Sequence, residues 1–204
     1  MPTKPIKISS TLEEGARFSC KMCGDCCRGF NDGDVFLYGE DITKLASFLG
    51  FDGNSGLRKF SKKYLKIIQT TFYWRKEGAK RGKNYSIGCI GFQFQGEDEH
   101  CAFLSSENAC TVHEARPLQC RSFPWWQKMV RSRNQIWKYA RKCPGLKDLN
   151  SSDAKFYSRE EIRSWAKREQ EAELKHFLKL KENDFDIFRA YPFLSKDLLL
   201  DEKD

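Results

Sequence analysis

Four cysteines fall within eight residues near the start of this chain, in the run Cys20-Lys-Met-Cys23-Gly-Asp-Cys26-Cys27. A C-x2-C-x2-C-C spacing is too dense for an ordinary disulfide framework, and the adjacent Cys26 and Cys27 could pair with each other only under severe strain. The nine cysteines of the chain also cannot all pair within it. Thiolates at this spacing can chelate a metal without closing a long loop. The run therefore predicts ligands for zinc or for an iron–sulfur cluster.

Four later cysteines extend the candidate ligand set. Cys89, in contrast, has no ligand spacing, and we interpret it as a small buried hydrophobe. His113 lies three residues after a candidate ligand and could bind the metal or hydrogen-bond a thiolate, although we prefer a packing role for it. His100 and His176 are expected to be ordinary surface or helix residues. The predicted metal ligands are Cys20, Cys23, Cys26, Cys27, Cys101, Cys110, Cys120 and Cys143.

Three separated blocks carry a family resemblance: C-x2-C-x2-C-C, then C-x-F-L with C-x2-H-E-x-R-P-x2-C-R-x-F-P, then C-P-G. In this order they resemble the CxxCxxCC cysteine-cluster family, a zinc- or iron-chelating domain also called YkgJ-like, over residues 18–145. One departure is His113, where the family leads us to expect tyrosine. Because the family includes domains of flagellin lysine N-methylases, the resemblance implies an alternative function, iron–sulfur-dependent methyl transfer from S-adenosylmethionine to a protein lysine. The sequence itself has no glycine-rich loop after a strand that would indicate a methyltransferase independently.

The identity of the metal is less constrained than its presence. A ferredoxin run has the spacing C-x2-C-x2-C-x3-C-P, whereas here the fourth cysteine is adjacent to the third. The Cys143-Pro144 pair nevertheless matches the ferredoxin ending, and the aromatic segment Phe123-Pro-Trp-Trp126 could shield a cluster from water. We therefore prefer iron–sulfur to zinc, and S-adenosylmethionine is a cofactor only under the alternative. The number of sites and the partition of cysteines between them stay open.

The formal charge of +8 has two interpretations. Thiolate-bound metal is anionic, so part of the basic excess can neutralise the protein's own centre. Arg116 and Arg121 could do this, could hold the loop through salt bridges, or could act as cofactor-binding residues that grip a carboxylate or phosphate. Between Arg58 and Lys83 there are ten Lys or Arg residues and one acid, Glu77. We prefer a solvated helix face there to a nucleic-acid site, because zinc-finger and RNA-binding signatures are missing from the sequence.

Composition and patterning predict a small α+β fold, cysteine-rich and metal-organised, with a C-terminal helical extension. A hydrophobic fraction of 40% is typical of a folded chain. We expect a cysteine-cluster domain over 1–150 and a helical extension over 151–204 packed on it. The sequence shows no secretory signal and no apolar run of membrane-spanning length, so we expect the reducing cytoplasm, where clustered cysteines act as ligands.

Periodicity predicts the main elements. We expect helices over 40–49, 57–68 and around 116–121, β-like structure over 85–94, and short strands at 101–104 and 135–139. A capping box from Ser158 to Glu161 predicts a long helix that reaches about Lys181. The leading functional hypothesis is a metal-binding protein with an accessory, redox or binding role. Its partner is expected to be a protein, with no membrane involved, while a nucleic-acid module and metal trafficking are weaker alternatives, and enzymatic activity stays undecided.

Overall fold

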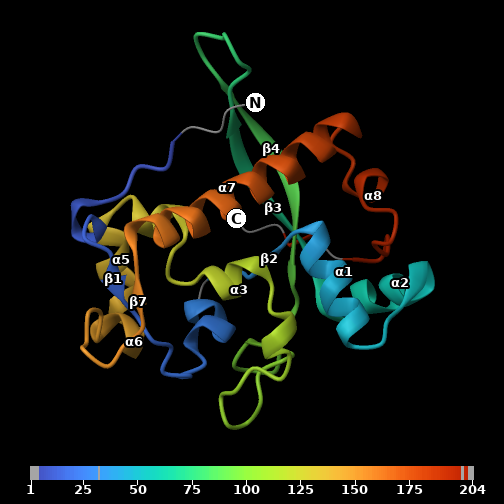
Figure 1. The fold of residues 1–204 in the computed structure, drawn as a ribbon. Coiled ribbons are helices and arrows are strands. Elements are labelled where there is room, and N and C mark those ends of the chain that lie inside the picture. The colour runs from blue at the N-terminus through green and yellow to red at the C-terminus, as the bar shows by residue number, and fades with distance from the viewer. Residues whose placement is uncertain (1–4, 32, 199, 202–204) are drawn as a thin grey trace.

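The computed structural model describes residues 5–31, 33–198 and 200–201. It confirms the predicted small α+β class, with mixed short strands and helices and one long C-terminal helix (Figure 1). Of the helices in this part of the chain, none is long and apolar enough to cross a membrane.

The sheet is built around one long antiparallel hairpin, which projects from the body in Figure 1. Its strands β3 and β4 pair over ten residues, from Leu65↔Phe92 to Trp74↔Lys83. Further strands extend it to the order β2-β4-β3-β8, in which β8 alone runs parallel to its neighbour. Two smaller two-stranded pairs are β1 with β7 and β5 with β6. The strands are β1 Ala16–Arg17, β2 Phe36–Leu37, β3 Leu65–Trp74, β4 Lys83–Phe92, β5 Phe94–Gln95, β6 His100–Cys101, β7 Phe156–Tyr157 and β8 Leu200–Asp201.

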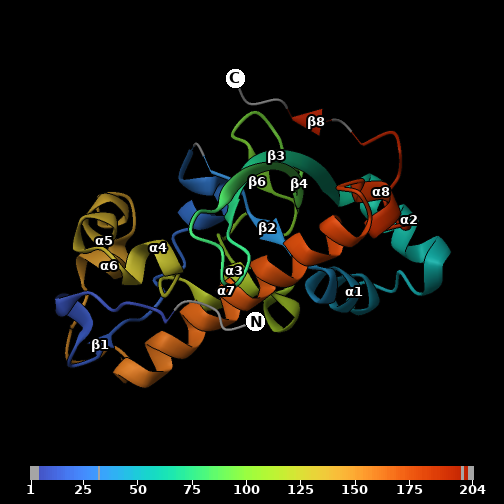
Figure 2. The same cartoon turned by 90° about the horizontal axis from the view of Figure 1, so that it is seen from above.

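The helices fall into two groups joined by α7. In Figures 1 and 2, α1, α2 and α8 lie beside the sheet, α4, α5 and α6 lie at the opposite end, and α7 runs across both. Three short 3-10 segments cover Ser10–Leu12, Asp25–Asn31 and His113–Ala115. The helices are α1 Gly39–Phe48, α2 Gly53–Tyr64, α3 Leu118–Ser122, α4 Gln127–Val130, α5 Arg133–Ala140, α6 Pro144–Lys147, α7 Arg159–Glu182 and α8 Ile187–Ala190.

Two hydrophobic cores correspond to these two groups. The sheet core contains the inner face of the hairpin with α1 and α2, and Phe177 and Leu180 from the second half of α7. The helical core contains the N-terminal segment and α4 to α6, and Ile162 and Ala166 from the first half of α7. All four of these α7 side chains are fully buried. One helix therefore anchors both cores, while the expected domain boundary at residue 150 stays a prediction.

The start of α7 is as predicted. The Glu161 backbone N–H donates to Ser158 Oγ at 3.2 Å, and the Ser158 N–H donates back to Glu161 Oε2 at 2.7 Å. These bonds satisfy two backbone donors that the first helical turn would otherwise leave unpaired. The helix ends at Glu182, close to the predicted end.

Two local predictions are wrong, and a third is only partly confirmed. Residues 135–139, expected as a strand, belong to α5, where Ile136 packs in the helical core. The second helix ends at Tyr64, and Ile67 and Ile68 belong to β3, paired with Ile90 and Cys89 of β4. His176 lies in helix α7, one of the two settings expected for it, but it is not ordinary, because it is buried, with its ring nitrogens 2.7 Å from Tyr191 Oη and 2.9 Å from the Gly88 carbonyl.

Candidate metal centre

Cysteines from four chain segments meet where the two cores adjoin. Cys143 is part of the helical core and Cys26 packs against it. Cys101 is part of the sheet core, and Cys27 packs against it, as do Cys110 and Cys120. The cysteine group defined by these six residues and Cys23 thus lies between two hydrophobic bodies.

The cysteine run is held against the loop that carries Cys110. Gly24 has a φ of 81°, and a Cβ at this position would lie 2.8 Å from Asn108 Oδ1, so only glycine fits this close approach. Arg28 follows in the 3-10 segment and donates to Asn108 Oδ1 at 3.3 Å. The same guanidinium pairs with Asp98 at 3.3 Å. Two side-chain contacts therefore join the run to distant loops.

Helix α3 is fixed at both its start and its middle, which positions Cys120. The Leu118 N–H donates to the buried Asp41 carboxylate at 2.9 Å. Gln119 bridges to the strand β2, because its Oε1 accepts the Phe36 N–H at 2.6 Å and its Nε2 donates to the Asp34 carbonyl at 3.1 Å. A helix of one turn cannot be stable by itself, so these bonds determine where its cysteine lies.

Cys143 is brought to the run by a close backbone approach. It immediately precedes α6, which begins with Pro144 at its first position. Ser19 is the residue before Cys20, and a Cβ on Gly145 would lie 2.6 Å from the Ser19 carbonyl oxygen. The glycine of the C-P-G motif therefore permits the contact that sets the last cysteine beside the first ones.

Cys26 lies near the thiols of the other cysteine-bearing segments. A side-chain hydrogen bond with Cys27 and burial both raise the pKa of its thiol far above the ordinary range. Burial raises the pKa of Cys120 well above its usual value, and the nearby charge of Cys26 raises it further. Burial likewise raises the pKa of Cys101 and of Cys143 to about 11, with Cys26 among the contributing charges in both cases. The thiols of separate segments are thus close enough to perturb one another.

Arg116 supplies positive charge to this group. Its guanidinium lowers the pKa of Cys110 and Cys120, against the larger effect of burial. Its Nε is buried and has no hydrogen-bond partner among the described residues. Arg121, by contrast, points away, since its Nε donates to the Arg116 carbonyl at 2.8 Å and its Nη2 lies 3.7 Å from Asp41. The two arginines predicted as cofactor-binding residues therefore occupy different places.

Two other candidates, and Cys89, lie outside the group. Cys20 is exposed at the start of the run, and its sulfur accepts the Met22 N–H at 3.4 Å. His113 is exposed on its 3-10 segment, which does not match the packing role preferred for it. Cys89 lies in β4 on the sheet core, where burial and then the charge of Glu173 raise its pKa to about 12.

An aromatic-lined cavity of about 240 Å³ opens beside two of the thiols. Cys26 and Cys120 line it together with Phe123, Trp126 and other residues. The Lys128 ammonium lies 5.4 Å from the Trp126 ring centroid and covers one side of this wall. Part of the aromatic segment Phe123-Pro-Trp-Trp126 therefore lies beside two of the thiols, while its role as a shield for a cluster stays a prediction.

The donor set fits a thiolate-bound metal, although not a preformed single-ion site. Within the described residues, no three His, Cys, Asp or Glu side chains lie close enough together to hold one ion. Arg116, whose Nε is buried and has no hydrogen-bond partner among the described residues, is suited to a zinc or an iron–sulfur centre, because thiolate-bound centres of both kinds are anionic.

These features define a class of small α+β proteins that gather cysteines from distant segments into one group. The chain belongs to the CxxCxxCC family: residues 19–144 match its family model, described as "Putative zinc- or iron-chelating domain". The matched range contains all nine cysteines and ends before α7. The predicted family is confirmed, and with it the general function of metal chelation. No solved structure matches the chain.

The basic residues between 58 and 83 do not form one surface element. Some lie in α2 and others in the β3–β4 hairpin. Lys66 is in β3, and its Nζ lies 3.1 Å from Asp34 Oδ1. The remainder at the hairpin turn, residues 75–83, are mostly exposed. The choice between a solvated surface and a nucleic-acid site stays a prediction.

Proposed function

We propose that this protein holds an iron–sulfur cluster through the cysteine group around Cys26 and serves as an accessory or redox protein. The observation that carries the proposal is that cysteines from four chain segments lie where the two hydrophobic cores adjoin. When bound, such a cluster supplies one-electron exchange at a potential set by its charge, its hydrogen bonds and its exposure to solvent.

Two features favour a cluster over a single zinc ion. The Cys143-Pro144 pair matches the end of a ferredoxin run. The cavity beside Cys26 and Cys120 is lined in part by the aromatic rings of Phe123 and Trp126, which would shield a bound cluster from part of the solvent. Zinc remains the competing outcome of the test below.

The residues of the chain have distinct roles under this proposal. Cys23, Cys26, Cys27, Cys101, Cys110, Cys120 and Cys143 are the candidate ligands, with Cys20 at the exposed edge as an eighth. Arg116 offsets the negative charge of the centre. The group must release protons when it binds metal, because burial keeps its free thiols neutral.

The test is the iron, zinc and acid-labile sulfide content of protein purified without oxygen, together with its visible spectrum. The proposal expects coloured protein with iron and sulfide in matching amounts. Colourless protein with stoichiometric zinc would replace the cluster by a structural zinc site. Protein that takes up neither metal after reconstitution would reject both.

The alternative, methyl transfer from S-adenosylmethionine to a protein lysine, rests on the family resemblance. Calorimetric titration of metal-loaded protein with S-adenosylmethionine tests it directly. Saturable binding would support the enzyme hypothesis. The absence of a heat of binding would contradict it and favour the accessory role. Under either function we propose a protein as the macromolecular partner.

A further inference from the structure

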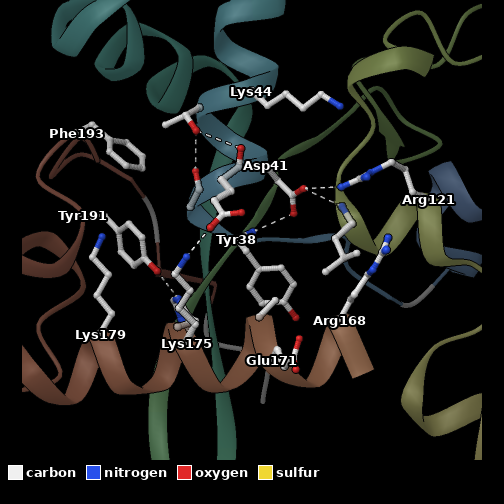
Figure 3. A pocket seen from close by; sticks show the side chains of 16 residues that line it. Tyr38, Asp41, Lys44, Arg121, Arg168, Glu171, Lys175, Lys179, Tyr191 and Phe193 are labelled. Atoms are coloured by element: carbon white, nitrogen blue, oxygen red, sulfur yellow. Dashed lines mark hydrogen bonds and ion pairs between the residues drawn. The ribbon is translucent and has the colours of Figure 1, made fainter. Parts of the chain in front are cut away.

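A second site lies on the other side of α3, in a cleft of about 790 Å³. Its walls are the first turns of α1, one side of α7, α3 and the segment after α8 (Figure 3). The volume lies within the range of small-molecule binding sites. The α7 wall follows the end of the family match at residue 144, so the family description does not assign this cleft.

The charge of the cleft is predominantly positive. The basic side chains that line it are Lys44, Arg121, Arg168, Lys175 and Lys179, against the acids Glu40, Asp41 and Glu171. The buried His176 adds no charge at neutral pH, because burial lowers its pKa from the ordinary value.

The basic groups differ in how firmly they are already engaged. The Asp41 carboxylate accepts the Leu118 N–H at 2.9 Å. Its distance to Arg121 Nη2 is 3.7 Å, so the ion pair of Asp41 with Arg121 is a long one. Arg168 stacks on Trp165, with its guanidinium carbon 4.8 Å from the ring centroid, and among the described residues it has no acidic partner. Figure 3 shows Arg121 and Arg168 at the same end of the cleft, from two facing elements. Two guanidinium groups so placed suit bidentate binding of phosphate or carboxylate oxygens.

The other end of the cleft is aromatic. Tyr191 and Phe193 line it, and the Lys179 ammonium lies 4.1 Å from the Tyr191 ring centroid. Figure 3 shows these three side chains together, well separated from the arginine end. A ligand with a charged head and a planar or apolar body would match both ends.

An ion pair within the protein crosses the middle of the cleft and would compete with a bound anion for one of the lysines. Glu40 and Lys175 join α1 to α7, and both side chains are largely exposed. Exposed pairs of this kind contribute about 0–1 kcal/mol. A ligand anion can therefore replace Glu40 as the partner of Lys175 at little cost.

We propose that this cleft binds a small molecule carrying two or more negative charges on phosphate or carboxylate groups, with Arg121 and Arg168 gripping the charged end. The proposal goes beyond the metal centre and does not depend on it.

The test is calorimetric titration of the metal-loaded protein with three probes at about 50 mM salt, where surface charges are weakly screened. Pyrophosphate has the phosphates alone, adenosine diphosphate adds a planar ring, and citrate has carboxylates without phosphate. Saturable binding of at least one probe is expected. Tighter binding of the diphosphate nucleotide than of pyrophosphate, lost in Phe193→Ala, would identify a ring-bearing ligand. Preference for citrate would identify a polycarboxylate.

Matched variants on one helix separate a site from general basicity. Arg168→Glu should weaken binding about tenfold or more, since it removes a charge-assisted contact. Arg163→Glu makes the same charge change on α7 outside the cleft and should leave affinity unchanged. Glu40→Gln should tighten binding. Binding of no probe, or equal weakening by the two reversals, would overturn the proposal. The metal content of the same samples is measured as well, so a loss of ligand binding can be distinguished from a loss of metal.

Discussion

The Arg116 guanidinium lies beside two buried thiols, and its Nε has no hydrogen-bond partner in the described part of the chain. We predict that Arg116→Met lowers metal affinity about tenfold or more, the range seen when groups that support metal ligands are removed. A competition assay against a chelator measures the change. Arg141→Met, at an exposed position, is the control and should retain the affinity of the natural protein. Equal affinities in the two variants would show that Arg116 does not stabilise the centre.

Glu169 gives a pH-dependent term in stability. Burial, chiefly, raises its pKa from 4.5 to about 7, and the charge of the neighbouring Glu173 adds to the shift. The folded state therefore binds this proton more tightly than the unfolded state. The resulting stability is present below about pH 4.5 and is lost as pH rises through about 7.

We predict that Glu169→Gln removes this loss. The variant should match the natural protein near pH 4.5 and exceed its free energy of unfolding at pH 8 by about 2 kcal/mol. The amide oxygen can still accept the Gln127 N–H that Glu169 accepts now. Urea unfolding at the two pH values measures it, with the exposed Glu171→Gln as control. A variant less stable than the natural protein at pH 8 would contradict the argument.

His176 shows what residue-level reasoning from sequence lacks. Its position on a charged helix resembled a surface position, yet its partners are Tyr191 and the Gly88 carbonyl, 88 residues away. Burial depends on which strand passes the helix, and helical periodicity does not contain that information. The cysteine spacing, in contrast, is local, so the run from Cys20 to Cys27 identifies its chemistry without the fold.

At the scale of elements, α7 and the hairpin β3–β4 stabilise each other. Phe177 is fully buried and stacks on Phe72 at a centroid distance of 4.6 Å, with Tyr85 at 5.2 Å. We predict that Phe177→Ala lowers the free energy of unfolding by about 3–5 kcal/mol, as in other large core truncations. Denaturant unfolding measures this, and Phe48→Ala, at a half-exposed site on α1, should cost much less. Similar losses in both would mean that α7 does not anchor the hairpin.

The elements most poorly predicted are those whose pattern suits two structures. The apolar residues Leu57, Phe60 and Tyr64 continue at helical spacing into Ile67 and Ile68, yet β3 begins at Leu65. Pairing with β4 determines that Ile67 and Ile68 are in a strand, because their β-branched side chains fit the pleated sheet. The capping box at Ser158 was decisive for α7, since a cap is a local hydrogen-bonding signal.

For the whole molecule, the cysteine group and α7 each contribute residues to both cores or pack against both. Structural metal sites contribute about 10 kcal/mol or more to folding. We predict that metal removal exposes residues 125–147, in the helical core, to faster hydrogen exchange than strands β3 and β4. Exchange followed by mass spectrometry, with and without metal, measures this. Uniform loss of protection, or none, would contradict a centre placed between the cores.

The overall class and the family were predictable from sequence, because both follow from cysteine spacing and composition. How the four cysteine-bearing segments meet was not. It depends on long-range contacts such as Gly24 against Asn108 and Gly145 against Ser19. The cleft was also hidden, since its walls come from α1, α3 and α7.

The central claim is that metal is held by the group around Cys26, and two single substitutions test it most directly. Cys26→Ser changes the thiol that perturbs its neighbours, while Cys89→Ser changes one that lies apart on the sheet. The measurement is the metal and sulfide content of both variants, purified without oxygen beside the natural protein. The account predicts that Cys26→Ser loses most of its metal and Cys89→Ser retains it. Full metal content in Cys26→Ser, or equal loss in both variants, would contradict it.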